Sequence, residues 1–524
     1  MIFSKYSKME ENQLSNYEKY CWSLLFLLTI LSLYDLMLQQ FIAPTILRQT
    51  HTAMLTENFV KEGFKIKGLY PNIFGTQKPV MAFEFPVYNS IVGLFFKVFG
   101  FNLFWGKLVS FLSSVISLVC ICRLLKDAYN DRVAILGGLF FILSPLGMML
   151  RTAFQPDSLA LMFVMLALIA LSKWYYKRSV VSMLIFAIFL LLGGLAKYPV
   201  IMPFLPLISL AFFTKNDRFH LPDVRSIAII TVIFVFPFLA WYLSCVNITD
   251  ARLAYLASDR SMFLIGDLKR FLSLFYYINP TYSIVMLGCS GVGALFLAFG
   301  LRNLSPVDKA LLFGIPFYFI IIPTVKDQHY YLFACTPVFA FFMAKGWLAL
   351  LETCKSRQMM LTKNVLFILF VACFSFLSLY AMVLRNDRVM VNSAQTVNSL
   401  SKPDDLVFAV TMHNRTAIFG GINSTFFYFA KRKGWNVDLG VFKQLDQNIL
   451  DKIKIQAETK RKEGAKWMII TWYTPDLESP VDAYLPVSAR TRVDPGIDGS
   501  IAYDMLKKEY ETAFQGKNYA VLKL

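Results

Sequence analysis

The sequence predicts a polytopic α-helical membrane protein of about eleven transmembrane helices, followed by a C-terminal extracytoplasmic α/β domain. Hydrophobic residues make up 56% of the 524 residues. Soluble domains typically contain about 45–50% apolar residues. The apolar residues are also gathered into long runs between 21 and 385, whereas residues 387–524 have the mixed composition of a soluble domain. The boundary divides the chain into a membrane domain, 1–386, and a soluble α/β domain, 387–524.

Each predicted transmembrane helix is an apolar run close to the roughly 20 residues that cross a bilayer. The first run is too long for a removable signal peptide and lacks a small-residue cleavage site, so we expect a retained first helix. The runs are 21–43, 103–125, 132–150, 157–174, 179–196, 198–214, 226–245, 281–301, 308–324, 330–352 and 364–384.

The loops between these runs alternate between rich and poor in Lys and Arg, which predicts their orientation. Cytoplasmic loops are the ones enriched in these cations. The rich loops carry Arg123, Lys126 and Arg132; Lys173, Lys177 and Arg178; Lys215, Arg218 and Arg225; Arg302 and Lys309; and Lys355, Arg357 and Lys363. The N-terminus is therefore expected inside and the C-terminus outside. Many of the cations behind the net charge of +18 lie in these loops, where they set the orientation of the helices, and no nucleic-acid partner is expected.

A long outer loop, residues 44–102, interrupts the pattern of apolar helices joined by short connections. Residues 50–63 have an amphipathic pattern that ends at Gly63, and a second short helix is predicted after Pro86, from Val87 to Phe99. A third interfacial piece is expected at 266–276. Long loops with their own structure are commonly functional.

The tail alternates predicted strands and helices, which favours a small α/β sheet domain. It contains none of the eight cysteines and neither a Gly-rich phosphate motif nor a metal-spaced His/Cys set. The predicted strands are 406–410, 467–471 and 519–522, and the predicted helices are 424–431, 449–463 and 502–514.

Acids and cations occur in four separate outer segments, and together they predict a polar site at the outer membrane surface. Ionisable groups are otherwise costly there. Each has a simpler alternative: Asp157 could only cap its helix, Lys197 could extend to the interface, and His329 could be an interfacial belt residue. Glu84 and Lys326 complete the set.

A series of short motifs, in this order, resembles the GT-C superfamily of polyprenyl-phosphate-sugar glycosyltransferases. The nearest branch contains dolichyl-phosphate-mannose protein mannosyltransferases and lipid A aminoarabinose transferases, and the resemblance covers most of residues 30–350. The motifs are Arg48-Gln49-Thr50-His51-Thr52-Ala53, Glu84-Phe85-Pro86-x-Tyr88, Phe96-Lys97-x-Phe99-Gly100, Ser144-Pro145, Pro156-Asp157-Ser158-Leu159, Lys197-x-Pro199 and His329-Tyr330-Tyr331.

The resemblance implies a multi-pass enzyme of a bacterial inner or plasma membrane, surrounded by membrane lipids. Such an enzyme transfers a hexose or pentose from a polyprenyl-phosphate sugar donor to a hydroxyl of a lipid, glycan or protein acceptor of the cell envelope, with inversion. The families usually place a catalytic Asp in the first outer loop, but residues 44–102 contain no Asp, and in relatives it falls where His51 stands.

The chemistry of this reaction suggests roles for the candidate residues. The departing phosphate has a second pKa of about 6, so it needs cations more than a proton. The acceptor hydroxyl needs a general base. The candidate bases are Glu84 first and His51 second, with Asp157 as an orienting acid or, with Glu84, a ligand of a divalent metal ion. The candidate phosphate partners are Lys197, Arg151, Lys326, His329 and Tyr330, and the candidate acceptor or sugar contacts are Arg48, Gln49 and Tyr88.

Two other classes of protein compete with the transferase. A transporter or flippase should carry charged residues near the bilayer midplane, and the central helix segments here are nearly free of charge apart from Asp35. A scaffold or receptor would have no need for acids at Glu84 and Asp157.

Overall fold

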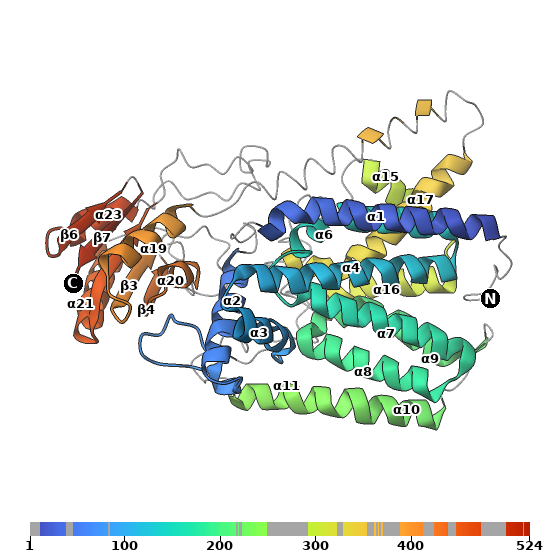
Figure 1. Cartoon of the computed structure of the whole chain (residues 1–524), viewed down its shortest axis with the longest axis horizontal. Coiled ribbons are helices and arrows are strands. Elements are labelled where there is room, and N and C mark those ends of the chain that lie inside the picture. Colours follow the sequence, from blue (N-terminus) through green and yellow to red (C-terminus); the bar gives the residue numbers. More distant parts are fainter. Residues whose placement is uncertain are drawn as a thin grey trace.

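The helices lie side by side in a bundle, and an α/β unit covers one end of it (Figure 1). The C-terminus of the chain lies in the α/β unit. The computed structural model describes residues 11–37, 46–81, 84–215, 218–219, 223–248, 292–321, 329–353, 361–362, 365, 368–369, 388–411, 424–438, 447–472, 499–516 and 518–524.

Among these residues, five helical segments are long and apolar enough to cross a membrane, as expected for a polytopic membrane protein. The segments are Leu103–Ala128, Asp157–Lys177, Val180–Phe213, Val224–Cys245 and Tyr330–Glu352. The elements of the bundle are α1 (Glu11–Met37), α4 (Leu103–Ala128), α5 (Asp131–Leu143), α6 (Pro145–Leu150), α7 (Asp157–Lys177), α8 (Val180–Lys197), η3 (Tyr198–Phe204), α9 (Leu205–Phe213), α10 (Val224–Ile230), η4 (Thr231–Val235), α11 (Phe236–Ile248), α15 (Val292–Gly300), α16 (Pro306–Ile321), η6 (His329–Cys335) and α17 (Thr336–Glu352).

The run 132–150, expected as one helix, is divided into α5 and α6 at Ser144. The Ser144 hydroxyl accepts a hydrogen bond from the Gly147 backbone N–H at 3.0 Å, which caps the new helix. Pro145 has no N–H to continue the α5 ladder. The single-helix prediction was therefore wrong at this point, although both parts are helical.

Two helices of the long loop lie across the end of the bundle that faces the α/β unit (Figure 1). Helix α2 (Ile46–Lys61) begins four residues before the predicted start and ends just before Gly63, whose φ of +70° suits glycine. Helix α3 (Val87–Phe99) has the predicted bounds. A short 3-10 turn, η2 (Ile66–Gly68), lies between them. The interfacial piece predicted at 266–276 falls outside the described residues.

The α/β unit contains a five-stranded sheet in the order β4-β3-β5-β7-β6. Strands β4, β3 and β5 are parallel, and β7 and β6 are added antiparallel. The strands are β3 (Leu406–Thr411), β4 (Lys433–Asp438), β5 (Ala465–Thr471), β6 (Glu511–Gln515) and β7 (Tyr519–Lys523), and the helices are α19 (Arg388–Leu400), α20 (Ser424–Ala430), α21 (Gln447–Lys462) and α23 (Gly499–Leu506).

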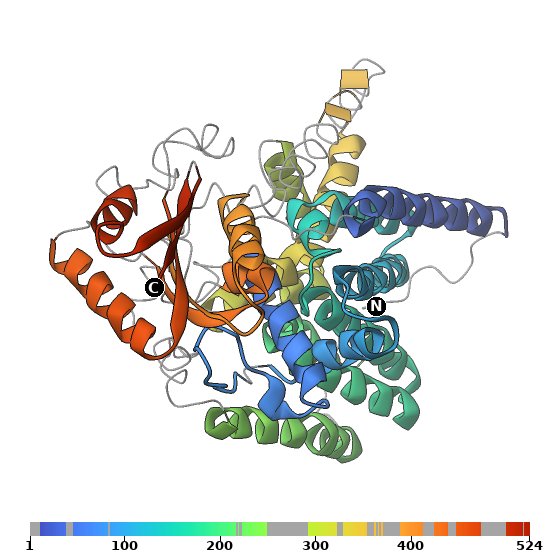
Figure 2. The ribbon, with the colours of Figure 1, turned by 60° about the vertical axis from the view of Figure 1, so that its left-hand side comes forward.

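Alternate residues of the central strands face opposite sides of the sheet. Val407 packs on the side of α19 and α20, whereas Phe408 packs with α21 and α23. The first of these clusters also includes Met54 of α2 and Tyr88 of α3, so one face of the sheet unit is continuous with the outer loop. In Figure 2 the blue helix α2 lies between the orange part of the unit and the bundle.

The three predicted strands of the tail are confirmed, as are the helices predicted at 424–431 and 449–463. The helix predicted at 502–514 is wrong in its second half, because α23 ends at Leu506 and residues 511–515 form β6. This edge strand is exposed along its length, so it lacks the apolar alternation that predicts a strand.

The first testable prediction concerns the side of the membrane on which these parts lie. The loop charges place the α2 end and the α/β unit outside. Cysteines introduced by Lys78→Cys and Gln515→Cys, both at exposed positions, are expected to react with a membrane-impermeant thiol reagent added to intact cells. The control Arg302→Cys, exposed in the loop before α16 that is predicted to be cytoplasmic, should react only after permeabilisation. If only the Arg302→Cys protein reacted in intact cells, the topology would be the inverse of the predicted one.

Candidate functional site

Two membrane helices meet at the covered end of the bundle through a buried ion pair. The Lys197 ammonium, at the end of α8, lies 2.7 Å from a carboxylate oxygen of Asp157, at the start of α7. An acid at a helix start and a cation at a helix end both suit the helix dipole. Each side chain is only 2% exposed, which excludes the alternative that Lys197 extends to the interface. It also shows that Asp157 does more than cap its helix.

The Lys197 ammonium is also covered by two aromatic rings from η6. It lies 4.4 Å from the ring centroid of Tyr330 and 4.6 Å from that of Tyr331, and the two rings are stacked. A cation over an aromatic face is attracted by the ring quadrupole, more strongly when desolvated. Lys197 is therefore held between a carboxylate and two tyrosines.

A second ion pair lies in the same region and joins the two outer helices. The Arg48 guanidinium, on α2, lies 2.5 Å from a carboxylate oxygen of Glu84, which precedes α3. Both groups are within electrostatic range of Asp157. These four residues, Arg48, Glu84, Asp157 and Lys197, are called the charge cluster below. It draws on four separate segments, and its formal charges sum to zero.

Several polar atoms beside these pairs are buried without a hydrogen-bond partner in the described part of the chain. They are Arg48 Nε, Asp157 Oδ2 and both amide atoms of Gln155. Buried polar groups in proteins are nearly always hydrogen-bonded. Gln155, whose amide offers both a donor and an acceptor, was not singled out in the sequence analysis. The site therefore has hydrogen-bond donors and acceptors available for a polar ligand.

His51 lies one turn after Arg48 on α2 and is half-buried. Burial and the Arg48 guanidinium together lower the pKa of His51 to about 3. The imidazole is therefore uncharged near neutral pH and is a weak proton acceptor.

The low pKa of His51 leads to a second prediction. Because the imidazole protonates only near pH 3 in the folded protein, no ionisation of His51 should appear in kcat/KM between about pH 5 and 8. His51→Gln should leave the shape of that profile unchanged. The unfolded pKa is about 6.5, so protonation should favour unfolding as the pH falls below that value. Thermal unfolding should then be less acid-sensitive in His51→Gln. An acidic limb near pH 6.5 that disappears in the variant would contradict this assignment.

Arg151 contacts helix α1. Its guanidinium is buried and donates a hydrogen bond to the Leu31 carbonyl oxygen at 2.6 Å. Nearby, Lys107 lies 3.6 Å from a carboxylate oxygen of Asp35 and donates to the Asp35 carbonyl oxygen, and Thr152 donates to the Asp35 carboxylate. Asp35 is therefore neutralised locally, and sequence reasoning missed Lys107 and Thr152 as its partners.

Two of the residues predicted to contact the acceptor or sugar make contacts within the protein. Gln49 Oε1 accepts a hydrogen bond from the Phe154 backbone N–H, and the Tyr88 hydroxyl donates to the Gly106 carbonyl oxygen at 2.8 Å. These bonds attach α2 and α3 to the bundle. Lys326 and the side chain of His329 lie outside the described residues, so their predicted roles stay predictions.

The acids of the site were also predicted as candidate metal ligands. In the described ranges of the chain, no three His, Cys, Asp or Glu side chains are grouped as a metal site would require. Glu84 and Asp157 each have a cation as partner instead. A divalent ion stays a prediction.

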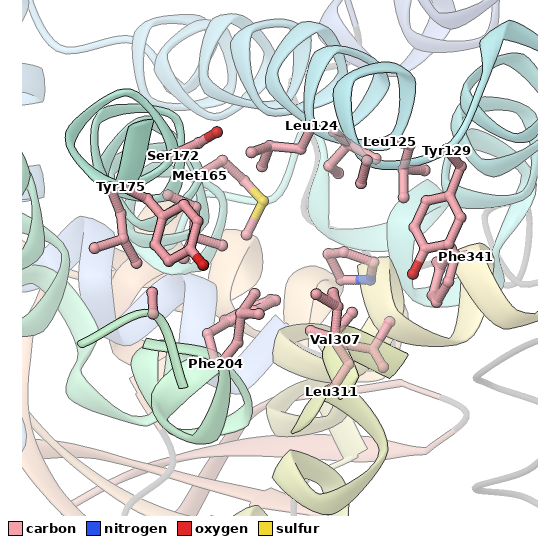
Figure 3. Close-up of a pocket in the computed structure, with 18 residues that line it drawn as sticks. Leu124, Leu125, Tyr129, Met165, Ser172, Tyr175, Phe204, Val307, Leu311 and Phe341 are labelled. Carbon is pink, nitrogen blue, oxygen red and sulfur yellow. The ribbon is translucent and has the colours of Figure 1, made fainter. Parts of the chain in front are cut away.

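An apolar cavity lies deeper in the bundle, between α4, α7, α9, α16 and α17 (Figure 3). Its lining includes Leu124, Met165, Phe204, Leu311 and Phe341 and contains no charged side chain. This lining has no cation to pair with a phosphate and no carboxylate or imidazole to act as a general base. The charge cluster is therefore the candidate site.

The fold and the charge cluster define a polytopic membrane protein with a charged site at one end of its helix bundle, beneath an α/β unit. Residues 77–241 match the model of the dolichyl-phosphate-mannose-protein mannosyltransferase family. The matched segment contains Glu84, Asp157 and Lys197. The resemblance to the GT-C superfamily is thereby confirmed.

Solved structures of two membrane proteins share this fold. The crystal structure of ArnT from Cupriavidus metallidurans bound to undecaprenyl phosphate matches with a TM-score of 0.56 and 12% identity, over 98% of each chain. The archaeal oligosaccharyltransferase AglB from Archaeoglobus fulgidus, in complex with an inhibitory peptide and a dolichol-phosphate, matches with a TM-score of 0.51 and 13% identity. That match covers 86% of this chain and 69% of AglB. No curated protein sequence matches the chain.

Proposed function

We propose that this protein is an integral membrane glycosyltransferase. It moves a sugar from a polyprenyl-phosphate-linked donor to an acceptor hydroxyl on the extracytoplasmic side, with inversion. The observation that carries the proposal is the charge cluster, in which two cations and two carboxylates meet beside unpartnered buried polar atoms. The similar structures of ArnT and AglB hold undecaprenyl phosphate and dolichol-phosphate, which supports a lipid-phosphate donor.

The cations of the cluster suit the leaving group. As the sugar departs, the bond between its anomeric carbon and the phosphate oxygen breaks, and the electron pair stays with polyprenyl phosphate. Lys197 and Arg48 are placed to stabilise this charge, and they do so in a site that is largely shielded from water. Arg48 Nε has no partner within the described residues, so it can donate to a phosphate oxygen.

Glu84 suits the role of general base. Its side chain is more exposed than that of Asp157, so it is the carboxylate that an incoming acceptor can reach. The acceptor hydroxyl transfers its proton to Glu84 as its oxygen bonds to the anomeric carbon. One displacement on the face opposite the phosphate inverts the configuration of that carbon.

The decisive experiment measures release of free polyprenyl phosphate from synthetic polyprenyl-phosphate sugars by the purified protein in lipid. We expect release that depends on an added acceptor and is lost in a Glu84→Gln variant. A protein that moves the intact donor lipid across vesicles without cleaving it would instead be a transporter, and the proposal would be wrong.

A further inference from the structure

Helix α2 is held between two parts of the protein. On the bundle side, Arg48 pairs with Glu84, and Thr56 Oγ1 accepts a hydrogen bond from Asn89 of α3 at 2.7 Å. On the other side, α2 packs on α20 of the α/β unit. The helix also carries many polar residues.

The contacts with the α/β unit are polar and specific. Thr50 Oγ1 lies 3.3 Å from Thr425 Oγ1. Two turns further along α2, Glu57 accepts a hydrogen bond from the Lys431 ammonium at 2.8 Å. A seven-residue spacing places Thr50 and Glu57 on the same side of a helix. The α/β unit therefore contacts α2 through side chains at two positions, Thr50 and Glu57.

The loop after α2 is attached to the same unit. The Gly75 N–H donates to the Gly434 carbonyl oxygen at 2.6 Å, and the Gly434 N–H donates to the Asn72 carbonyl oxygen at 3.1 Å. The Trp435 indole covers Gly75 so closely that a Cβ there would lie 2.1 Å from a ring carbon. Asn58 of α2 in turn donates to the Tyr70 carbonyl oxygen and to Asn72. Hydrogen bonds therefore link helix α2, the loop that follows it and strand β4.

We propose that the C-terminal α/β unit is a positioning element for the transferase site, acting through α2. Its contacts to Thr50, Glu57 and Gly75 hold the helix in the orientation that pairs Arg48 with Glu84. A displacement of about 1 Å at a catalytic group can cost on the order of a hundredfold in rate. This inference rests on the proposed function, but the position of α2 can be measured without it.

The test reverses the charges of the Glu57–Lys431 pair. Lys431→Glu and Glu57→Lys are each expected to lower kcat about tenfold or more, by misplacing Arg48, and to leave the unfolding temperature little changed. A pair with an exposed partner such as Lys431 contributes little to global stability. The double variant, with both charges exchanged, should recover kcat. The control Lys454→Glu, which breaks the Lys454–Glu509 pair elsewhere on the α/β unit, should behave as wild type.

A readout that does not use the reaction separates this inference from the proposed function. Amide hydrogen exchange of residues 46–61 should accelerate in each single variant and return to the wild-type rate in the exchanged pair. This holds even if the donor is not a polyprenyl-phosphate sugar. Unchanged exchange and unchanged kcat in both single variants would overturn the inference.

A cross-link gives a second, independent check. Thr50→Cys with Thr425→Cys, oxidised to a disulfide in the Lys431→Glu background, should restore kcat, and reduction should reverse the gain. Loss of activity on oxidation in an otherwise wild-type background would show that α2 must leave the α/β unit during turnover. That result would also overturn a fixed positioning role.

Discussion

Glu84→Gln is expected to lower the rate of sugar transfer by about 10²–10⁴-fold while donor binding is retained. The amide keeps the shape of the side chain and can still accept a hydrogen bond from Arg48, but it cannot take a proton. Donor affinity and turnover should be measured separately, with the variant purified in lipid. Full activity in Glu84→Gln would exclude Glu84 as the base and make His51→Ala the next variant to test.

Glu62→Gln is the matched control for this experiment. Glu62 lies on the same outer loop and also pairs with a cation, since Lys78 lies 2.6 Å from its carboxylate. That pair is solvent-accessible and lies outside the charge cluster, so its loss should change the stability little and leave turnover unchanged. A comparable loss of activity in both variants would point to general damage to the loop.

Lys197→Met is expected to have the second large effect, on both stability and donor use. Methionine is similar in length to lysine but carries no charge, so the variant leaves the buried Asp157 carboxylate without its cation. Removing one partner of a buried ion pair typically costs about 3–5 kcal/mol. Adding Asp157→Asn removes the uncompensated charge, so the double variant should recover most of the stability. It should not recover donor binding, because the phosphate still lacks its cation.

The pair Lys345–Asp308 provides the control. Lys345 lies 2.6 Å from a largely buried carboxylate, near the loop that precedes α16 and away from the charge cluster. Lys345→Met should also destabilise the protein, Lys345→Met with Asp308→Asn should recover the stability, and both variants should use the donor normally. If the Lys197→Met, Asp157→Asn protein also used the donor normally, the Lys197 pair would have a structural role only.

The sequence predicted the acids and the lysine of the site because each lies at the end of a strongly apolar helix. Positions such as Asp157 and Lys197 are marked by the change from charge to a long apolar run, and this signal is local. The same runs predicted the bounds of α3 and most of α7. The charge alternation of the loops then placed these ends on one side.

What the sequence could not predict is which partner each charge takes. The pairing of Arg48 with Glu84 joins residues 36 positions apart, and it depends on how α2 lies across the bundle. Arg151 was grouped with Lys197 because both occur in outer turns, yet it is bound to the side of α1. The strand at 511–515 was missed for a related reason, since an exposed edge strand depends on pairing with β7 rather than on its own pattern.

The neutrality of the charge cluster has a consequence for turnover. A phosphate that approaches Lys197 competes with a carboxylate that is already in place, so under the proposed function we expect the donor to be bound by an exchange of ion-pair partners. The donor brings one negative charge, and the product lipid phosphate brings up to two. In the proposed reaction the two carboxylates of the cluster oppose part of the attraction between its cations and the more highly charged product. In the proposed reaction Asp157 pairs with Lys197 again as the product leaves, and we therefore expect only weak inhibition by the lipid product.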